Sequence, residues 1–227
     1  MKLVIFDLDN TLVNFAATRE AAYTGMSALL VEEGIDAAAY LRVCGELDRP
    51  LFKQFEQGTL TRQQYRMRRF SEPLRRLGLA ENFDLVRRLN AIFMECVNDR
   101  PLLYDDVLPV LHALRAGGIH TAILTNGPSD GQRRKLHATG LLESVDQIAI
   151  GEEIGVSKPL PGAFHAVVAR FSLPAGDALM VGDSPELDYD GALQAGLQAR
   201  LLDRSGEQAL GPRRAIRTLT ALIDGDA

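Results

Sequence analysis

Five short runs of mostly apolar residues recur along the chain. They lie at Leu3–Phe6, Thr121–Leu124, Gln147–Ile150, Ala178–Val181 and Ala199–Leu202. Within each run the apolar residues follow one another instead of alternating with polar ones. This pattern is typical of strands that are covered on both faces. We therefore predict five buried β-strands.

Segments with apolar residues at helical spacing lie between these runs. They are Val107–Ala116, Ser129–Thr139, Pro161–Phe171 and Leu187–Ala195. Three of them stop at a glycine and one begins with a proline, which are common at helix ends and in first turns, respectively. Strands that alternate with helices indicate an α/β fold with a parallel sheet and right-handed crossovers.

The region after the first strand differs, because it has helical periodicity and almost no strand signal. Its helical segments include Thr18–Glu33, Ala37–Gly45, Arg62–Leu77 and Phe83–Cys96. We predict that residues 15–100 form an all-helical cap domain, inserted into a core domain made of residues 1–14 and 101–227. The alternative is that these helices pack on the sheet within a single domain.

Composition narrows the possible partners. The 227 residues carry a formal net charge of −5, which argues against a nucleic-acid binder because such a protein needs a basic surface. No stretch is long and apolar enough for a membrane span or a signal peptide, so we expect a cytoplasmic protein that has no membrane partner.

Cys44 and Cys96 lie in no paired or metal-binding motif, and we expect both to be free thiols.

Two aspartates follow the first predicted strand. Asp7 and Asp9 lie two positions apart, so on an extended segment their side chains point to the same side. Two such charges repel by roughly 4 kcal/mol at about 4 Å with an effective dielectric constant near 20. A metal ion or a shared proton would relieve this repulsion. Alone, the pair is also compatible with a chance turn.

A second acidic cluster follows the fourth predicted strand. Asp183 follows the apolar run and Gly182 directly, and Asp188 lies five positions farther along the chain. Carboxyl ends of parallel strands form the binding crevice, so these acids and Asp7 are expected to converge. Oxygen ligands without His or Cys favour Mg²⁺ over zinc. The alternative interpretation of Asp183 is a helix N-cap.

Polar residues also follow the second and third predicted strands. Thr125, Asn126 and the backbone N–H groups at a helix start are suited to phosphate oxygens, although helix capping also explains Thr125. Lys158 is suited to neutralise phosphoryl charge, although taken alone it fits a solvated surface lysine better.

In this order, the segments resemble the four motifs of the haloacid dehalogenase-like (HAD) hydrolase superfamily. Asp7–Leu12 resembles the first motif, Thr125–Asn126 the second, Lys158–Pro159 the third and Gly182–Ala192 the fourth. The helical insert is similar to that of helical-cap subfamily I. The resemblance implies a Rossmann-like core with sheet order 5-4-1-2-3 and helices on both faces, one Mg²⁺ and a phosphoaspartyl intermediate.

The resemblance also implies a role for each acid. Asp7 would be the nucleophile, and Asp9 would protonate the leaving alcohol and then activate water. Asp7, Asp183 and the backbone carbonyl of Asp9 would hold Mg²⁺. Asp188 would support or join this shell.

The remaining roles concern the substrate. Thr125, Asn126 and Lys158 would hold the phosphoryl oxygens, and the cap would close and select the substrate. Thr61–Arg76 is rich in arginine, which usually indicates a solvated helix face. The sharper hypothesis is that Arg69 or a neighbouring residue reaches an anionic group of the substrate. Arg69 with Phe70 also resembles the branch that holds nucleotidases and acylneuraminate phosphatases.

Asp9 distinguishes between chemistries within the superfamily. Phosphatase members carry an acid at this position and dehalogenase members lack it. A phosphate ester needs its leaving oxygen protonated, whereas a halide leaves unaided. We therefore predict a Mg²⁺-dependent phosphomonoester hydrolase, monomeric or homodimeric, that acts on a small phosphorylated metabolite of the nucleotide or sugar phosphate type. The alternatives are a 2-haloacid dehalogenase-like or phosphonate-cleaving hydrolase and a non-catalytic phosphate-binding module.

Overall fold

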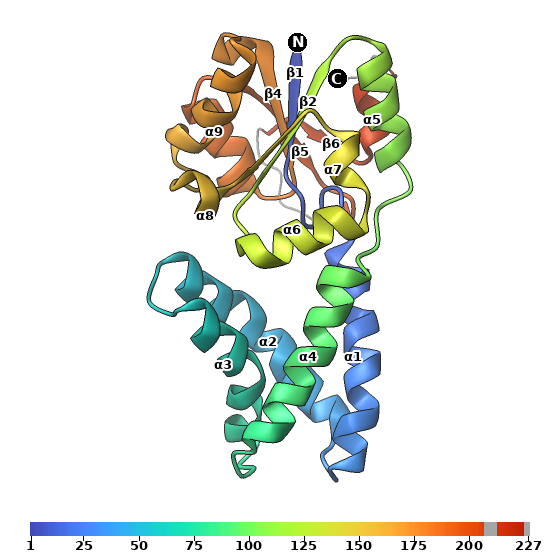
Figure 1. The fold of residues 1–227 in the computed structure, drawn as a ribbon, viewed down its shortest axis with the longest axis vertical. Coiled ribbons are helices and arrows are strands. Elements are labelled where there is room, and N and C mark those ends of the chain that lie inside the picture. Colours follow the sequence, from blue (N-terminus) through green and yellow to red (C-terminus); the bar gives the residue numbers. More distant parts are fainter. Residues whose placement is uncertain (207–212, 225–227) are drawn as a thin grey trace. The chain divides into compact units, whose positions relative to one another are not determined.

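A parallel β-sheet forms the centre of the core in a computed structural model that describes residues 1–206 and 213–224 (Figure 1). Within these residues the strand order is β3-β2-β1-β4-β5-β6, and every pairing is parallel. The strands are β1 (Leu3–Phe6), β2 (His120–Thr125), β3 (Gln147–Ile150), β4 (Ala178–Gly182), β5 (Gln198–Leu202) and β6 (Ala215–Ile216). The predicted order 5-4-1-2-3 is confirmed, and β6 extends it at the edge beside β5.

The sheet is buried on both faces, as continuous apolar runs predict. Val4 and Phe6 of β1 belong to one apolar core, and Leu3 and Ile5 belong to the other. This alternation follows from the two-residue repeat of a strand. The central strand therefore has no solvated face, and Asp7 follows directly after it.

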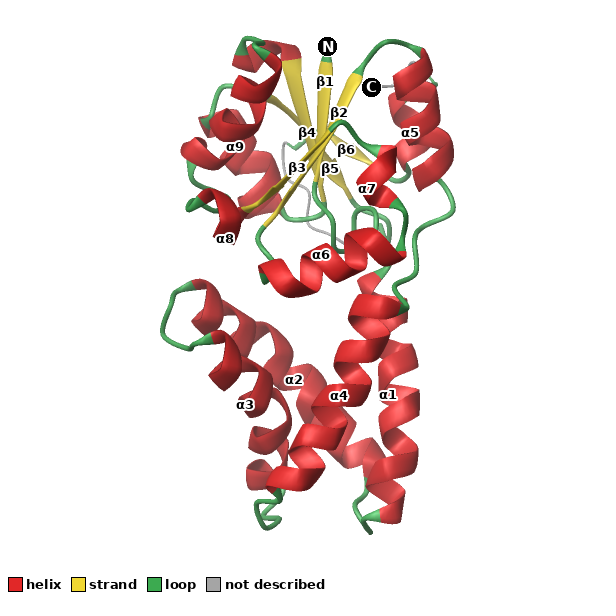
Figure 2. Ribbon diagram, in the orientation of Figure 1, coloured by secondary structure: helices red, strands yellow, loops and turns green. Residues whose placement is uncertain are grey.

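Helices supply the other half of each core (Figure 2). On the face of Phe6, apolar residues of α5 (Val107–Ala116) pack with those of α6 (Ser129–Ala138) and α7 (Leu141–Ser144). On the opposite face, α9 (Pro161–Val168) and α10 (Gly191–Gln194) provide the packing. The predicted α/β layering, with helices on both faces, is therefore confirmed.

The remaining short elements of the core were not predicted as separate elements. They are α8 (Gly151–Ile154), the 3-10 helices η1 (Ala169–Phe171), η2 (Ala175–Asp177) and η4 (Leu219–Leu222), and the π-helix η3 (Pro185–Asp190). The predicted helix Leu187–Ala195 is in fact η3 followed by α10. It begins two residues earlier because Pro185 suits a first turn and the Ser184 side chain accepts a hydrogen bond from Leu187 N.

The chain divides into two compact units, one of residues 1–15 and 101–227 and one of residues 16–100. The second holds almost all of α1 (Phe15–Glu32) together with α2 (Ala37–Glu56), α3 (Arg62–Arg76) and α4 (Phe83–Asp99). The prediction that α2 ends at Gly45 was wrong. It continues through Pro50, because Leu47 and Leu51 are buried in the apolar cluster between α2 and α3, and such packing overrides local propensity.

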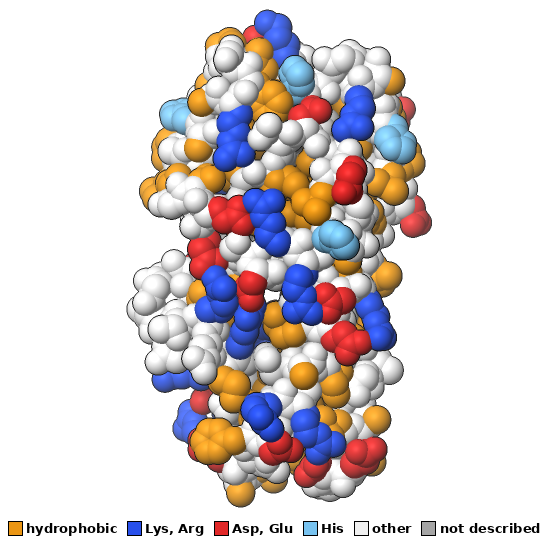
Figure 3. All heavy atoms as spheres, in the orientation of Figure 1, with side chains coloured by type: hydrophobic (Ala, Val, Ile, Leu, Met, Phe, Trp, Pro, Cys, Tyr) orange, Lys and Arg blue, Asp and Glu red, His pale blue; other side chains and the backbone are white. Residues whose placement is uncertain are grey.

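On the face drawn in Figure 3, Lys and Arg side chains lie among Asp and Glu side chains. Among the helices within residues 1–206 and 213–224, none combines the length and the apolar character that a membrane crossing requires.

Candidate active site

The loop after β1 turns sharply and places two acids at the end of the sheet. Asp7 N donates to Val181 O of the neighbouring β4 at 2.9 Å, so Asp7 still continues the sheet pairing. Asn10 then adopts a left-handed conformation with φ 62°, which Asn tolerates better than most residues. Leu12 N and Val13 N both donate to Leu8 O, closing a tight turn. Asp7 precedes this turn, whereas Asp9 lies within it.

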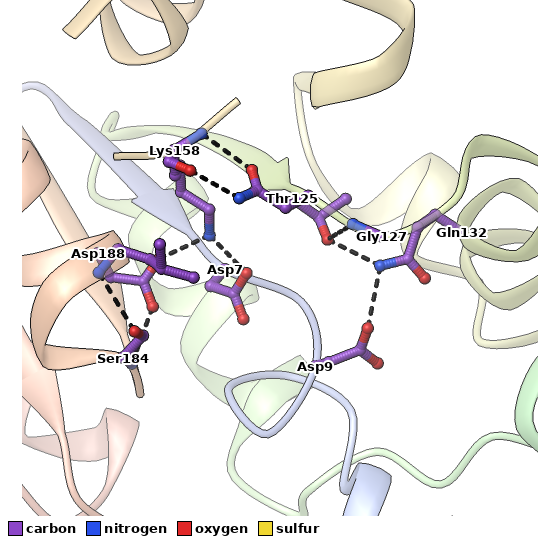
Figure 4. A network of polar contacts seen from close by, with 10 residues as sticks. Asp7, Asp9, Thr125, Gly127, Gln132, Lys158, Ser184 and Asp188 are labelled. Atoms are coloured by element: carbon purple, nitrogen blue, oxygen red, sulfur yellow. Dashed lines mark hydrogen bonds and ion pairs between the residues drawn. The ribbon is translucent and has the colours of Figure 1, made fainter. Parts of the chain in front are cut away.

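Lys158 lies at the centre of the candidate site (Figure 4). Its Nζ donates to Asp7 Oδ1 and to Asp188 Oδ1, each at 2.6 Å. All three side chains are buried, and the side chain of Lys158 is only 2% exposed. The predicted convergence of the first, third and fourth motifs is therefore present in the structure.

Asp188 is placed by the chain immediately around it. Ser184 N donates to Asp188 Oδ2 at 3.0 Å, while Asp188 Oδ1 accepts from Lys158. Both carboxylate oxygens are therefore engaged. A Cβ atom on Gly182 would lie 2.3 Å from Asp188 Oδ2, so the residue at position 182 has to be glycine for this carboxylate to occupy its place.

Three carboxylates form a group that fits a metal ion. One oxygen from each of Asp7, Asp183 and Asp188 lies within 4.8 Å of the others. Among residues 1–206 and 213–224, the Lys158 ammonium contacts Asp7 and Asp188, so the three acids in their ionised form leave two excess negative charges. An all-oxygen donor set with this charge suits Mg²⁺.

Burial and the excess negative charge of the cluster shift the pKa values of Asp7 and Asp183. Burial, only partly offset by the charge of Lys158, raises the pKa of Asp7 to about 7. Burial and the charges of Asp7 and Asp188 raise the pKa of Asp183 to about 8. Although burial by itself lowers the pKa of Lys158, the charges of Asp188 and Asp7 raise it overall. The cluster thus takes up protons that a divalent cation would replace.

The second motif lies beside Lys158. The Asn126 side chain donates to Lys158 O at 2.8 Å and accepts from Lys158 N at 2.9 Å. These bonds fix the backbone of Lys158, a positioning role that the sequence did not predict for Asn126. Thr125 is buried, and its Oγ1 accepts from Gln132 Nε2 at 2.7 Å. The predicted contacts of Thr125 and Asn126 with a phosphoryl group remain predictions.

Two residues of α6 hold Asp9 and were not predicted. Gln132 Nε2 donates to Asp9 Oδ2 at 3.0 Å, and Lys135 Nζ forms an ion pair with Asp9 Oδ1. Both are buried polar residues three positions apart on α6. The sequence carried a partial signal for this pair. Residues three positions apart lie on the same face of a helix, and in α6 that face is buried.

Arg69 lies inside the helical unit. Its guanidinium carbon lies 4.4 Å from the centre of the Tyr65 ring and 4.5 Å from that of Phe93, and its Nε lies 3.9 Å from Asp48 Oδ1. Arg69 Nη2 also donates to the Tyr65 hydroxyl. These contacts stabilise the packing of α2, α3 and α4. Arg69 is therefore buried, and the expectation that it lies on a solvated helix face was wrong. Its contact with a substrate anion stays a prediction.

Comparisons with known proteins agree with this geometry. The family model described as haloacid dehalogenase-like hydrolase matches residues 1–196. The N-acylneuraminate-9-phosphatase of Mus musculus is 29% identical, over 92% of this chain and 86% of its own length. The pyrimidine 5'-nucleotidase YjjG of Escherichia coli is 27% identical, over 96% of this chain and 95% of its own length.

A solved structure has the same fold. The HAD-hydrolase YfnB of Bacillus subtilis, solved bound to magnesium, matches with a TM-score of 0.80 and 24% identity, covering 98% of this chain and 97% of its own. The family match extends over all four motifs, whose residues the structure brings together around Lys158 and Asp9. The chain therefore belongs to the haloacid dehalogenase-like hydrolases.

Proposed function

We propose that the protein is a phosphatase that hydrolyses phosphomonoesters through a phosphoaspartyl intermediate on Asp7. The observation that carries the proposal is the buried Asp7 carboxylate, held by Lys158 Nζ at 2.6 Å beside two further acids. Relatives named as phosphatases and a nucleotidase support the same chemistry.

The first step forms a bond between Asp7 and phosphorus. An oxygen of the Asp7 carboxylate attacks the phosphorus, the ester P–O bond breaks, and the leaving oxygen takes a proton from Asp9, which enters this step as a carboxylic acid. Lys158 neutralises charge at Asp7 and at the attacked group. The O–H of Thr125 is suited to donate to a phosphoryl oxygen, because both of its hydrogen bonds in the structure use Oγ1 as the acceptor.

The second step releases phosphate. Asp9, now a carboxylate, takes a proton from a water molecule, and the resulting hydroxide attacks phosphorus. The bond between phosphorus and Asp7 breaks, which restores the free carboxylate and yields inorganic phosphate. Covalent catalysis of this kind divides one difficult step into two easier ones.

Asp7, Asp183 and the backbone carbonyl of Asp9 are the groups that we propose to hold Mg²⁺, with Asp188 supporting them. When bound, Mg²⁺ supplies charge neutralisation and a template for the phosphoryl group. The two excess negative charges of the cluster and its purely oxygen ligands support this assignment.

For the substrate, we propose a small phosphorylated metabolite of the nucleotide or sugar phosphate type. The relatives named above act, by their names, on an acylneuraminate phosphate and on pyrimidine nucleotides. A panel of phosphorylated metabolites, assayed for phosphate release with Mg²⁺ and again with a chelator, tests both the substrate class and the metal dependence. Activity that is unchanged by the chelator would exclude the metal assignment.

Asp9 argues against the dehalogenase alternative. A halide needs no proton on leaving, yet Asp9 is held by two buried donors at the site. Measurement of chloride released from 2-chloropropionate is the direct check. Chloride release without phosphatase activity would replace our proposal.

Replacement of Asp7 tests the nucleophile. We expect Asp7→Asn to lower kcat/KM for p-nitrophenyl phosphate at least about a thousandfold, because the neutral amide cannot form the intermediate. Thermal unfolding should show that the variant remains folded. Asp105→Asn, which makes the same change at an exposed acid of the core unit, is the matched control and should keep wild-type activity. Robust turnover by Asp7→Asn would remove Asp7 from the nucleophile's role.

A further inference from the structure

The carboxylate of Asp9 is held from a single helix. Gln132 Nε2 donates to Asp9 Oδ2 at 3.0 Å, as Figure 4 shows, and Lys135 Nζ pairs with Asp9 Oδ1. Both donors come from α6, more than 120 residues away along the chain. Each carboxylate oxygen therefore has its own donor, which limits the directions in which the group can point.

The two donors belong to the interior. Gln132 is 2% and Lys135 is 3% exposed, whereas the side chain of Asp9 is 32% exposed. Lys135 Nζ also lies 5.4 Å from the centre of the Phe15 ring. A buried ammonium is costly unless an anion offsets its charge. Asp9 provides that charge from a side chain that is more exposed than its two donors.

The chain makes room for Gln132. A Cβ atom on Gly127 would lie 2.3 Å from Gln132 Nε2, so a larger residue at position 127 would displace the amide. The same Nε2 also donates to Thr125 Oγ1 at 2.7 Å. One amide thus connects the loop after β1 with the end of β2, and the two groups keep a fixed separation.

We infer that Gln132 and Lys135 are positioning residues that aim the Asp9 side chain, first as a carboxylic acid at the leaving oxygen and afterwards as a carboxylate at the attacking water. This inference rests on the proposed phosphatase function. A side chain that is one-third exposed and lies on a loop has several rotamers available, and proton transfer requires heavy atoms within about 3 Å of each other. The two donors select one orientation of the Asp9 side chain before the substrate binds. The reaction then does not have to spend free energy on ordering this side chain.

Substrates with different leaving groups give the test. Phenyl phosphate needs protonation of its leaving oxygen more than p-nitrophenyl phosphate does, because the nitro group stabilises the phenolate. A well-aimed acid contributes about 10²- to 10⁴-fold. For Gln132→Met and Lys135→Met we therefore expect kcat/KM to fall about 30-fold or more on phenyl phosphate and less than about threefold on p-nitrophenyl phosphate.

Matched variants separate positioning from folding. Arg134→Met removes an exposed cation of the same helix and should leave both substrates unchanged. Lys135→Arg keeps the charge and should recover part of the loss on phenyl phosphate. Gln132→Met changes no charge, so it tests the inference even where Lys135→Met reduces stability. Combined with Asp9→Asn, either methionine variant should add little further loss, because its effect passes through Asp9.

The outcomes also distinguish this inference from the proposed function. If the wild-type protein hydrolyses neither aryl phosphate, the phosphatase proposal fails. If the wild type hydrolyses both and the methionine variants lose equally on the two substrates, or lose nothing, Gln132 and Lys135 do not aim Asp9 and the inference alone is overturned.

Discussion

Gly182 and Asp188 show how one missing side chain shapes the candidate site. The space that a Cβ atom would take at position 182 is occupied by the carboxylate of Asp188. That carboxylate in turn binds Lys158, which binds Asp7. A change of one methyl group at Gly182 is therefore transmitted to the proposed nucleophile through two polar contacts.

We expect Gly182→Ala to lower phosphatase activity about 10- to 100-fold, the range for residues that support metal ligands. The reason is the displacement of Asp188, and kcat/KM for p-nitrophenyl phosphate at several Mg²⁺ concentrations measures it. Gly176→Ala, at the opposite end of β4, is the control because nothing lies within 4 Å of its added Cβ. Equal activity of the two variants would contradict the role assigned to Asp188.

The raised pKa values of Asp7 and Asp183, about 7 and about 8, predict a pH dependence. Since an unfolded Asp has a pKa of about 4, the folded metal-free protein binds more protons than the unfolded chain between about pH 4 and pH 8. Its stability therefore falls as the pH rises through that range. Mg²⁺ has to displace these protons, so its apparent affinity should be at least about tenfold higher at pH 8.5 than at pH 6.

Thermal unfolding with and without Mg²⁺ measures this effect. The rise in Tm on adding Mg²⁺ should be larger at pH 8.5 than at pH 6. Asp183→Asn removes one of the two titrating acids and should reduce the difference. A Mg²⁺-induced rise in Tm that is the same at both pH values would show that the acids hold no proton in the metal-free protein.

The start of α3 is set by local sequence. Before α3, Thr61 Oγ1 accepts from Gln64 N at 3.2 Å, and Gln64 Oε1 accepts from Thr61 N at 2.9 Å. This reciprocal capping box explains why the predicted and observed starts of α3 agree. By contrast, α2 runs past Gly45 and Pro50, because its end is decided by packing against α3.

Removal of this cap should weaken the helical unit. We expect Thr61→Ala to lower the free energy of unfolding by about 1 kcal/mol, since it leaves backbone donors of the first turn without their partner. Thr61→Ser keeps the hydroxyl and should remain close to the wild type. Urea unfolding of the three proteins measures the difference, and an alanine variant as stable as the serine variant would show that the cap contributes nothing.

The order of the strands assembles the site from distant segments. Because β1 lies between β2 and β4, Asp7 is flanked by the end of β2 and by the loop after β4. The loop that carries Lys158 follows β3 and α8, and the Asn126 side chain fixes its backbone. Parallel strands place all these segments at the same edge of the sheet, which is where α/β proteins bind their ligands.

The sequence alone determined the five longer strands, the longer helices between them and the four acids of the candidate site. These features depend on local apolar runs, glycine and proline positions and residue types, which can be read along the chain. The strand order and the family came from the resemblance of the motifs, which the structure and the family match confirm. The two-residue strand β6 was missed because so short a segment carries no pattern.

Only the tertiary structure decided which polar groups meet. It pairs Lys158 with both Asp7 and Asp188, turns Gln132 and Lys135 towards Asp9, and buries Arg69 between aromatic rings. The physical reason is that a buried polar group takes whatever partner the packing brings within reach, and that partner can lie more than 100 residues away. Periodicity reports how deeply a residue is buried, whereas its hydrogen-bond partner depends on how helices and strands pack together.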